Sequence, residues 1–207
     1  MLSPPATTEP DLISQVQGLA PAYNGIGDYV IVIAGTAYSQ IKMSVHEHKR
    51  HARTNLKVGV ITASDTRTLD TDESGRLIRI LFEGAGHQIC YYEILPDDRE
   101  KLSAAIVENL PNVDAIVVNG GTGISARDNS TEVVKSLIDK ELDGFGEIFR
   151  MLSFQQIGSA AIMSRAIAGV RNGKLVIALP GSPDACKLAM DQLIIPEIGH
   201  IVSLLGK

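Results

Sequence analysis

The sequence has few of the residues on which several classes of protein depend. Its 207 residues include only two cysteines, Cys90 and Cys186, and no tryptophan. Because the cysteines lie far apart and form no Cys-x-x-Cys pair, we expect neither a disulfide framework nor a cysteine-based metal site. We interpret both as buried small hydrophobic residues in a reduced compartment. No apolar run approaches the roughly 20 residues that span a bilayer. The sequence therefore predicts a cytoplasmic protein without a membrane partner.

Positive charge is also scarce. The 19 Lys and Arg residues against 24 Asp and Glu residues give a net charge of −5. An extended nucleic-acid groove requires a broad basic surface, so we expect no nucleic-acid partner, although a local pocket for a small anion fits this balance. The hydrophobic fraction of 44% and the charged fraction of 21% are typical of an ordinary globular protein. The chain length favours one well-cored domain.

Residues 1–42 differ from the rest of the chain. The first 24 residues are rich in Pro, Thr, Ser and Ala and lack the basic start of a secretory signal, so we interpret them as poorly ordered. Met43 opens a polar, basic leader over residues 43–55. We predict that residues 1–42 lie outside the core, either as an artefact of an upstream start site or as a dispensable extension. Residues 56–207 are expected to form the folded α/β domain.

The leader contains a cluster of three histidines, His46, His48 and His51. Three histidines at such spacing can ligate zinc, but these lie among basic residues and no carboxylate or cysteine is spaced to complete a closed site. A solvated leader is therefore the favoured interpretation.

Strand and helix patterns alternate from residue 56 onward. Such alternation is typical of a doubly wound α/β fold with a mainly parallel sheet. In the first expected helix, Leu77, Ile80 and Leu81 are placed on one face. An Asn-Gly pair at 172–173 between two apolar runs predicts an antiparallel edge hairpin. The expected elements are strand 56–64, helix 73–86, strand 87–95, helix 99–110, strand 113–119, helix 130–139, helix 144–157 and a final helix capped by Ser182 with Pro183 at its first position.

A glycine-rich segment follows the third expected strand. This glycine loop consists of Gly120, Gly121, Thr122 and Gly123. Ligands of open α/β sheets bind beyond the carboxyl ends of strands, where bare backbone N–H groups and a helix N-terminus can hold an anion. Asn129 with Glu132 three residues later fits a capping box at the start of that helix. The loop lacks the signatures of a P-loop and of a dinucleotide fingerprint, so a tight strand–helix connection and a phosphate cradle both stay open.

Two further segments place polar groups at strand ends. A second glycine turn, the LPGSP loop, contains Pro180, Gly181 and Ser182 and precedes a capped helix. Two helix N-termini could together bind a ligand that has more than one anionic group. The SDTRT segment, which begins with Ser64 and Asp65, lies at the end of the first expected strand.

Three aspartates, Asp65, Asp97 and Asp128, lie between strands and helices. Aspartate is also a routine helix cap, and Asp97 with a glutamate three residues later fits simple capping. If the site holds phosphates, these carboxylates would repel them unless a divalent cation is present. Mg²⁺ binds through one or two carboxylates together with phosphates and water. Arg127 and Arg165 could complement the same phosphate charge.

In combination, these motifs resemble the MoaB/Mog family of molybdenum cofactor biosynthesis proteins. The motifs SDTRT, ILPDD, NGGTGIS, GFGEIFR, SRA and ALPGSP occur in the family's order, and the resemblance covers residues 56–203. The SDTRT motif and the basic leader look more like the MoaB branch than the Mog branch.

The resemblance implies a three-layer α/β/α molybdopterin-binding domain that assembles as a homotrimer or homohexamer. Active members transfer an adenylyl group from Mg-ATP to the terminal phosphate of molybdopterin and release pyrophosphate. Asp97 and Asp128 align with two functionally important aspartates of the family, so they are the expected catalytic residues and candidate Mg²⁺ ligands. The glycine loop, the LPGSP loop, Ser64 and Asp65 are the expected contacts for molybdopterin and ATP.

A second interpretation stays open. Some members of the MoaB branch look like binding proteins without transferase activity, so the chain could bind molybdopterin or serve in assembly without catalysis. The presence of both Asp97 and Asp128 favours the adenylyltransferase.

Overall fold

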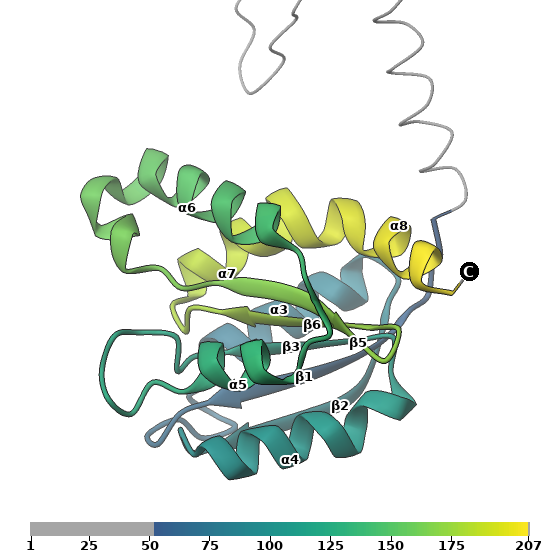
Figure 1. The fold of residues 1–207 in the computed structure, drawn as a ribbon, viewed down its shortest axis with the longest axis horizontal. Coiled ribbons are helices and arrows are strands. Elements are labelled where there is room, and N and C mark those ends of the chain that lie inside the picture. The colour runs from purple at the N-terminus through teal and green to yellow at the C-terminus, as the bar shows by residue number, and fades with distance from the viewer. Residues whose placement is uncertain (1–51, 207) are drawn as a thin grey trace, which may run out of the picture. The chain divides into compact units, whose positions relative to one another are not determined.

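The computed structural model describes residues 52–206 (Figure 1). The expectations for residues 1–42 and for the three histidines of the leader lie outside the described residues and stay predictions. The described residues form a six-stranded sheet with the strand order β2-β1-β3-β6-β5-β4.

The elements follow the expected alternation closely. The short helices η1 (Leu110–Asn112) and η2 (Gly158–Met163) and the two-residue strand β4 (Lys140–Glu141) were not expected from the sequence. The other elements are β1 (Lys57–Ala63), α3 (Glu73–Gly84), β2 (Gln88–Leu95), α4 (Arg99–Asn109), β3 (Ala115–Asn119), α5 (Ser130–Leu137), α6 (Asp143–Ile157), β5 (Ile167–Arg171), β6 (Lys174–Leu179), α7 (Pro183–Ala189), the π-helical η3 (Met190–Ile194) and α8 (Ile195–Leu205).

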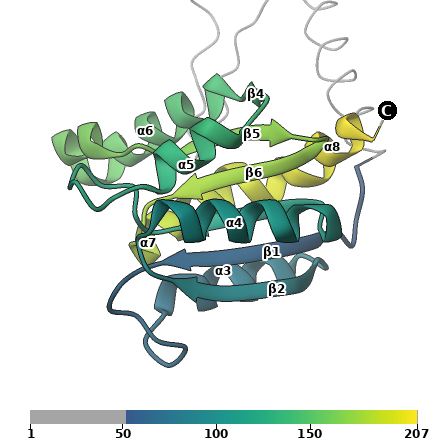
Figure 2. The same ribbon diagram turned by 60° about the horizontal axis from the view of Figure 1, so that its bottom comes forward.

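The sheet is mixed, as the sequence predicts. β1 pairs in parallel with β2 and β3, and β3 pairs in parallel with β6. β5 is antiparallel to both β6 and β4, and the expected hairpin closes at the pair Arg171 and Lys174. The chain continues from β1 into α3 and from β3 into α5, which lie on opposite faces of the sheet (Figure 2). The carboxyl ends of these two neighbouring strands therefore open a crevice of the kind that binds ligands in α/β proteins.

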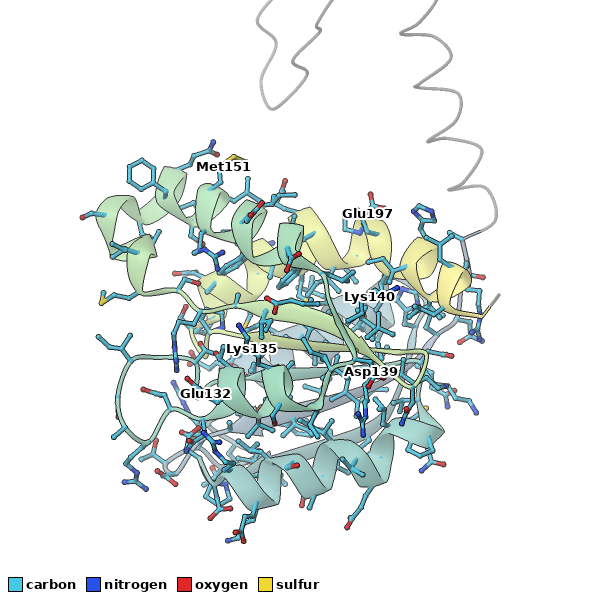
Figure 3. All side chains as sticks on the ribbon, in the orientation of Figure 1. Glu132, Lys135, Asp139, Lys140, Met151 and Glu197 are labelled. Carbon is cyan, nitrogen blue, oxygen red and sulfur yellow. The ribbon has the colours of Figure 1, made fainter. Side chains whose placement is uncertain are left out.

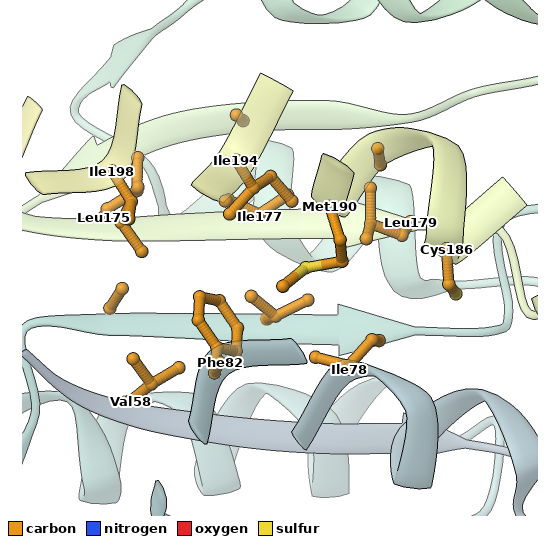
Figure 4. Packing of buried hydrophobic residues seen from close by; sticks show 14 of the residues in the cluster. Val58, Ile78, Phe82, Leu175, Ile177, Leu179, Cys186, Met190, Ile194 and Ile198 are labelled. Atoms are coloured by element: carbon orange, nitrogen blue, oxygen red, sulfur yellow. The ribbon is translucent and has the colours of Figure 1, made fainter. Parts of the chain in front are cut away.

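Two helical layers cover the sheet. In Figure 2, α4 and α5 lie in front of the sheet, whereas α3, α7 and α8 lie behind it. Apolar residues on both faces form separate buried clusters, because a mainly parallel sheet needs cover on both sides. The three-layer α/β/α expectation is confirmed. Figure 4 labels members of the larger cluster: Val58, Ile78, Phe82, Leu175, Ile177, Leu179, Cys186, Met190, Ile194 and Ile198.

The structure refines the sequence interpretation in two places. Ile78 and Phe82 are the buried apolar residues of α3, whereas Ile80, which we placed on one face with Leu77 and Leu81, is 56% exposed. The first turn of the helix lies close to β1, because a Cβ on Gly75 would lie 2.6 Å from Thr62 Oγ1. Cys186 is buried as expected, but Cys90 is exposed on the edge strand β2.

The C-terminal helical stretch is long and strongly apolar. By length and composition alone, Pro183–Leu205 is one helix that could cross a membrane. Its inward residues Cys186, Met190, Ile194 and Ile198 pack against the sheet and α3 (Figure 4), which is the placement of a core helix.

A buried carboxylate lies close to the carboxyl ends of the strands. Asp72 is 2% exposed and caps α3, where its Oδ1 accepts hydrogen bonds from Gly75 N (2.9 Å) and Ser74 Oγ (3.1 Å). Its Oδ2 accepts hydrogen bonds from Thr62 Oγ1 (2.5 Å) on β1 and Tyr92 OH (2.6 Å) on β2. Burial raises the pKa of this carboxyl, but the four hydrogen bonds outweigh burial and hold the pKa below its usual range.

The same network reaches the end of β3. The one proton of the Ser74 hydroxyl is shared between Asp72 Oδ1 and Asn119 Oδ1 (2.8 Å), and Asn119 Nδ2 donates to Thr62 Oγ1 (2.9 Å) and Ile61 O (3.2 Å). Because Asn119 directly precedes the glycine loop, the network fixes where that loop leaves the sheet.

Replacing Asp72 by Ala is expected to lower the free energy of unfolding by about 3–4 kcal/mol at neutral pH, because it removes a cap and strands several buried donors. Tyr92→Phe, which removes one donor only, should cost about 1 kcal/mol. The ionised Asp72 stabilises the fold above the ordinary aspartate pKa, and this stability is lost as the pH falls through the lowered folded pKa. Urea denaturation would measure both variants, and a loss below 1 kcal/mol for Asp72→Ala would contradict the role of the network.

Candidate functional site

The glycine loop and the LPGSP loop meet beyond the ends of β3 and β6. Gly120 N donates a hydrogen bond to Leu179 O (3.0 Å). A Cβ on Gly181 would lie 3.1 Å from Gly120 Cα, so the two backbones are in close contact. Ser182 Oγ accepts a hydrogen bond from Ala185 N (3.3 Å), which confirms the predicted cap of α7. The structure therefore brings the two expected loops together.

A cavity of about 360 Å³ lies against both loops. This volume is in the range of about 300–1,000 Å³ that is typical of small-molecule sites. One side is polar backbone from the two loops, and the other is a mostly apolar wall from α6 and η2. The lining includes Gly120, Gly121, Thr122, Gly123, Asp128, Phe149, Ser153, Ile157, Met163, Ser164, Pro180, Gly181 and Ser182.

Asp97 does not cap the helix that follows it. The N-cap of α4 is Asp98, whose Oδ1 accepts a hydrogen bond from Lys101 N (2.9 Å). The capping interpretation of Asp97 is therefore wrong, because its neighbour takes that position. Asp97 Oδ1 is buried and has no hydrogen-bond partner. A buried carboxylate oxygen without a partner is costly, so its presence points to a group that binds there.

Gly121 packs directly against this oxygen. Gly121 has a φ of +60°, and a Cβ at this position would overlap Asp97 Oδ1 and lie 2.6 Å from Ser130 Oγ. A side chain would therefore collide with the carboxylate, and glycine is required both for the backbone conformation and for this close approach.

The expected capping box is not formed. Asn129 precedes α5 but makes no side-chain cap; its Nδ2 donates to Asp97 O (3.3 Å) and Arg127 O (2.9 Å). Asn129 thus ties the backbone of Asp97 to the loop that carries Asp128.

The three aspartates influence one another without forming one cluster. Asp128 lines the cavity, and its Oδ2 accepts a hydrogen bond from Ser125 N (2.8 Å). Asp65 pairs with Arg127 at 2.5 Å, so Arg127 faces a carboxylate where we expected a phosphate. Burial raises the pKa of Asp97, and the carboxylates of Asp128 and Asp65 raise it further, while Arg127 lowers it.

Ser64 and Asp65 lie apart from the cavity. They line a second, open hollow of about 540 Å³, together with Arg67 and Glu93. Ser64 Oγ accepts hydrogen bonds from Thr66 N (3.3 Å) and Arg67 N (3.2 Å), so it shapes its own loop. The expected binding residues therefore divide between two hollows, which no sequence motif indicated.

Arg165 holds the glycine loop through hydrogen bonds to its backbone carbonyl groups. Sequence reasoning missed this role. Its Nε donates to Thr122 O (3.0 Å), and its Nη2 donates to Gly123 O and to Asp128 O (3.4 Å). The guanidinium also pairs with Glu132 on α5, which is labelled in Figure 3. These contacts occupy the donors that we expected to complement a ligand phosphate.

The donor set suits a cation that arrives with a nucleotide. Within residues 52–206, no three or more His, Cys, Asp and Glu side chains are grouped so as to hold a metal ion by themselves. Nucleotide-bound Mg²⁺ needs only one or two carboxylates, because phosphates and water complete its shell. The partnerless oxygen of Asp97, which lies against Gly121 and close enough to Asp128 for their charges to interact, fits that requirement.

Residues 59–200 match the family model described as "Probable molybdopterin binding domain". The chain therefore belongs to this family, and it is a protein of molybdenum cofactor biosynthesis. Within the family it is similar to the molybdenum cofactor biosynthesis protein B of two bacteria. It is 51% identical to the Halalkalibacterium halodurans protein over 163 residues, which cover 77% of this chain and 96% of the relative. It is 51% identical to the Bacillus subtilis protein over 168 residues, which cover 80% and 99%.

Solved structures agree with this placement. A crystal structure of molybdenum cofactor biosynthesis protein B has a TM-score of 0.73 at 46% identity and covers 75% of this chain and 98% of that chain. The tungsten cofactor synthesizing protein MoaB from Pyrococcus furiosus has a TM-score of 0.69 at 37% identity, with coverage of 75% and 100%. The resemblance noted in the sequence is thereby confirmed.

Replacing Asp97 by Asn is expected to raise the free energy of unfolding by about 1 kcal/mol at neutral pH, as substitutions that relieve strain at functional sites commonly do. Because the folded pKa of Asp97 is raised, the wild type loses stability as the pH rises from the ordinary aspartate pKa through the folded value. The difference in the free energy of unfolding between Asp97→Asn and the wild type should therefore disappear near pH 4.

Asp98→Asn is the matched control, because Asn is an equally good N-cap, and at pH 7 this variant should be as stable as the wild type. Urea denaturation at pH 7 and about pH 4 measures the difference. A lower stability of Asp97→Asn at pH 7 would show that the carboxylate is satisfied within the fold.

Proposed function

We propose that this protein binds molybdopterin and ATP in the cavity between the glycine loop and the LPGSP loop, and transfers an adenylyl group to the terminal phosphate of molybdopterin. The single observation that carries this proposal is the buried, partnerless oxygen of Asp97 next to the glycine loop. A protein that served only as a scaffold would gain nothing from leaving a carboxylate unsatisfied.

The chain's residues would act by positioning and by charge. Backbone N–H groups of the two loops would bind phosphate oxygens, and the start of α7 would add the positive end of a helix dipole. Asp97 and Asp128 would hold the Mg²⁺ that accompanies ATP, and that ion supplies charge neutralisation at the phosphates. The apolar wall formed by Phe149, Ile157 and Met163 would exclude water from the reacting groups.

The transfer needs no general base from the protein. A phosphate oxygen of molybdopterin forms a bond to the α-phosphorus of ATP. The bond from that phosphorus to the oxygen bridging to the β-phosphorus breaks, and its electron pair leaves with pyrophosphate. Because the attacking oxygen is already anionic, no side chain has to remove a proton from it.

Incubation of the full-length protein with molybdopterin and Mg-ATP should yield adenylylated molybdopterin, detected by mass spectrometry. Asp97→Asn and Asp128→Ala should each lower the initial rate at least tenfold, whereas Asp98→Asn, which alters only the exposed cap of α4, should retain it. Tight binding of molybdopterin without product would mean that the protein is a non-catalytic binding member of its family.

We also infer that the protein is a homo-oligomer, a homotrimer or homohexamer, that associates through the outer surface of α6 and η2. Six large apolar side chains are exposed on these two helices, and Met151 points away from the sheet in Figure 3. A group of this kind is typical of a protein interface. The six residues are Ile148, Met151, Phe154, Ile157, Ile162 and Met163, of which Ile157 and Met163 also line the cavity.

Phe154→Glu should convert the oligomer to monomer at micromolar concentration, because it places a charge in the contact. Val107→Glu is the matched control, since Val107 is a similarly exposed apolar residue on α4, far from this surface in sequence. Size-exclusion chromatography with light scattering gives the masses. A monomeric wild type, or dissociation by both variants alike, would overturn the assignment of this surface.

A further inference from the structure

Ser130 is a buried residue whose hydroxyl has no role within the described fold. It is 1% exposed, and Ser130 Oγ has no hydrogen-bond partner. Its backbone N–H is already used, donating to Gly121 O (2.9 Å), and the cap position of α5 belongs to Asn129. Alanine would hold the same place in the helix with a better helix propensity and without a buried hydroxyl to satisfy. The hydroxyl therefore calls for an explanation outside the fold.

The hydroxyl lies beside the partnerless oxygen of Asp97. Within residues 52–206, three buried side-chain polar atoms lack a partner, and two of them, Asp97 Oδ1 and Ser130 Oγ, flank Gly121. A Cβ on Gly121 would overlap the first and lie 2.6 Å from the second. The two oxygens come from different segments, the β2–α4 loop and the start of α5, yet they do not hydrogen-bond to each other.

We propose that Ser130 is a ligand-binding residue of this site, whose hydroxyl oxygen coordinates the same divalent cation as Asp97. This inference rests on the proposed function, which brings a Mg²⁺ ion to Asp97, and it adds a residue that no motif singled out. Mg²⁺ prefers hard oxygen ligands, and a serine or threonine hydroxyl at the start of a helix is one of the ligands of Mg²⁺ in P-loop NTPases.

A serine ligand differs from a further carboxylate in its charge. A hydroxyl adds an oxygen donor without adding negative charge, so the cation would keep enough positive charge to attract nucleotide phosphates. Glycine at 121 lets both oxygens lie close to the loop, because a Cβ there would collide with the first and lie 2.6 Å from the second.

Replacement of the hydroxyl by a thiol tests direct coordination. Soft thiolate ligands favour soft metals over Mg²⁺ and Mn²⁺, so Ser130→Cys should weaken Mn²⁺ binding and strengthen Cd²⁺ binding. Cys90 is exposed and could itself bind Cd²⁺, so all proteins carry Cys90→Ser. Equilibrium dialysis of the full chain against MnCl₂ or CdCl₂ alone gives both affinities.

We expect Ser130→Ala to lower the Mn²⁺ affinity about tenfold and to melt at or above the wild-type temperature. Ser130→Cys should bind Cd²⁺ at least tenfold more tightly than the protein with serine, and adding Asp97→Asn should abolish that gain. If the gain in Cd²⁺ affinity requires Asp97, the two residues bind the same ion. A thiol exposed by unfolding would bind Cd²⁺ whether or not Asp97 is present. Unchanged Mn²⁺ binding in Ser130→Ala, or a Cd²⁺ gain that survives Asp97→Asn, would overturn the proposal.

The outcome is independent of the transferase assay. A Cd²⁺ gain that requires Asp97, in a protein that forms no adenylylated molybdopterin, would support the cation site and overturn the proposed reaction. Suppose instead that adenylyl transfer depends on Asp97 but Ser130→Cys changes neither the Mn²⁺ affinity nor the Cd²⁺ affinity. This result would support the reaction and overturn the role of Ser130.

Discussion

The hydrogen bonds to the buried carboxylate of Asp72 are the interaction on which the arrangement of the strand ends depends. They join β1 through Thr62, β2 through Tyr92 and α3 through its first turn, and Ser74 extends them to Asn119 at the end of β3. Hydrophobic packing is non-directional and would tolerate small shifts between these elements. Directional hydrogen bonds to one buried anion do not tolerate such shifts. The loops that follow β1 and β3 therefore start from fixed positions.

The sequence was a good guide to the scaffold because its signals are local and repeated. β-branched runs marked the buried strands, and Asn172 with Gly173 marked the hairpin. In α3 the apolar pattern grouped Ile80 with Leu77 and Leu81, but the buried apolar residues are Ile78 and Phe82. Several apolar residues compete in that helix, and periodicity alone does not show which of them face the sheet.

The same limit applies to the site. Motifs identified the glycine loop, the LPGSP loop and the aspartates, but could not show whether Asp97 or Asp98 caps α4. Nor could they show that Arg165 and Arg127 are engaged by the protein itself, or that Ser64 and Asp65 face a separate hollow. Partners of this kind are chosen by tertiary packing. Ser130 carries no motif signal, and only its burial without a partner distinguishes it.

The contacts of Arg165 determine which way the peptide groups of the glycine loop point. A peptide unit is planar and trans, so its carbonyl oxygen and its N–H group point in opposite directions. By drawing the carbonyl oxygens of Thr122 and Gly123 toward itself, the guanidinium turns the N–H groups of Gly123 and Ile124 away from it. The arginine thus orients the loop's dipoles without touching what they would bind. A lysine would keep the charge but lack the planar fork of donors that holds adjacent peptides in one orientation.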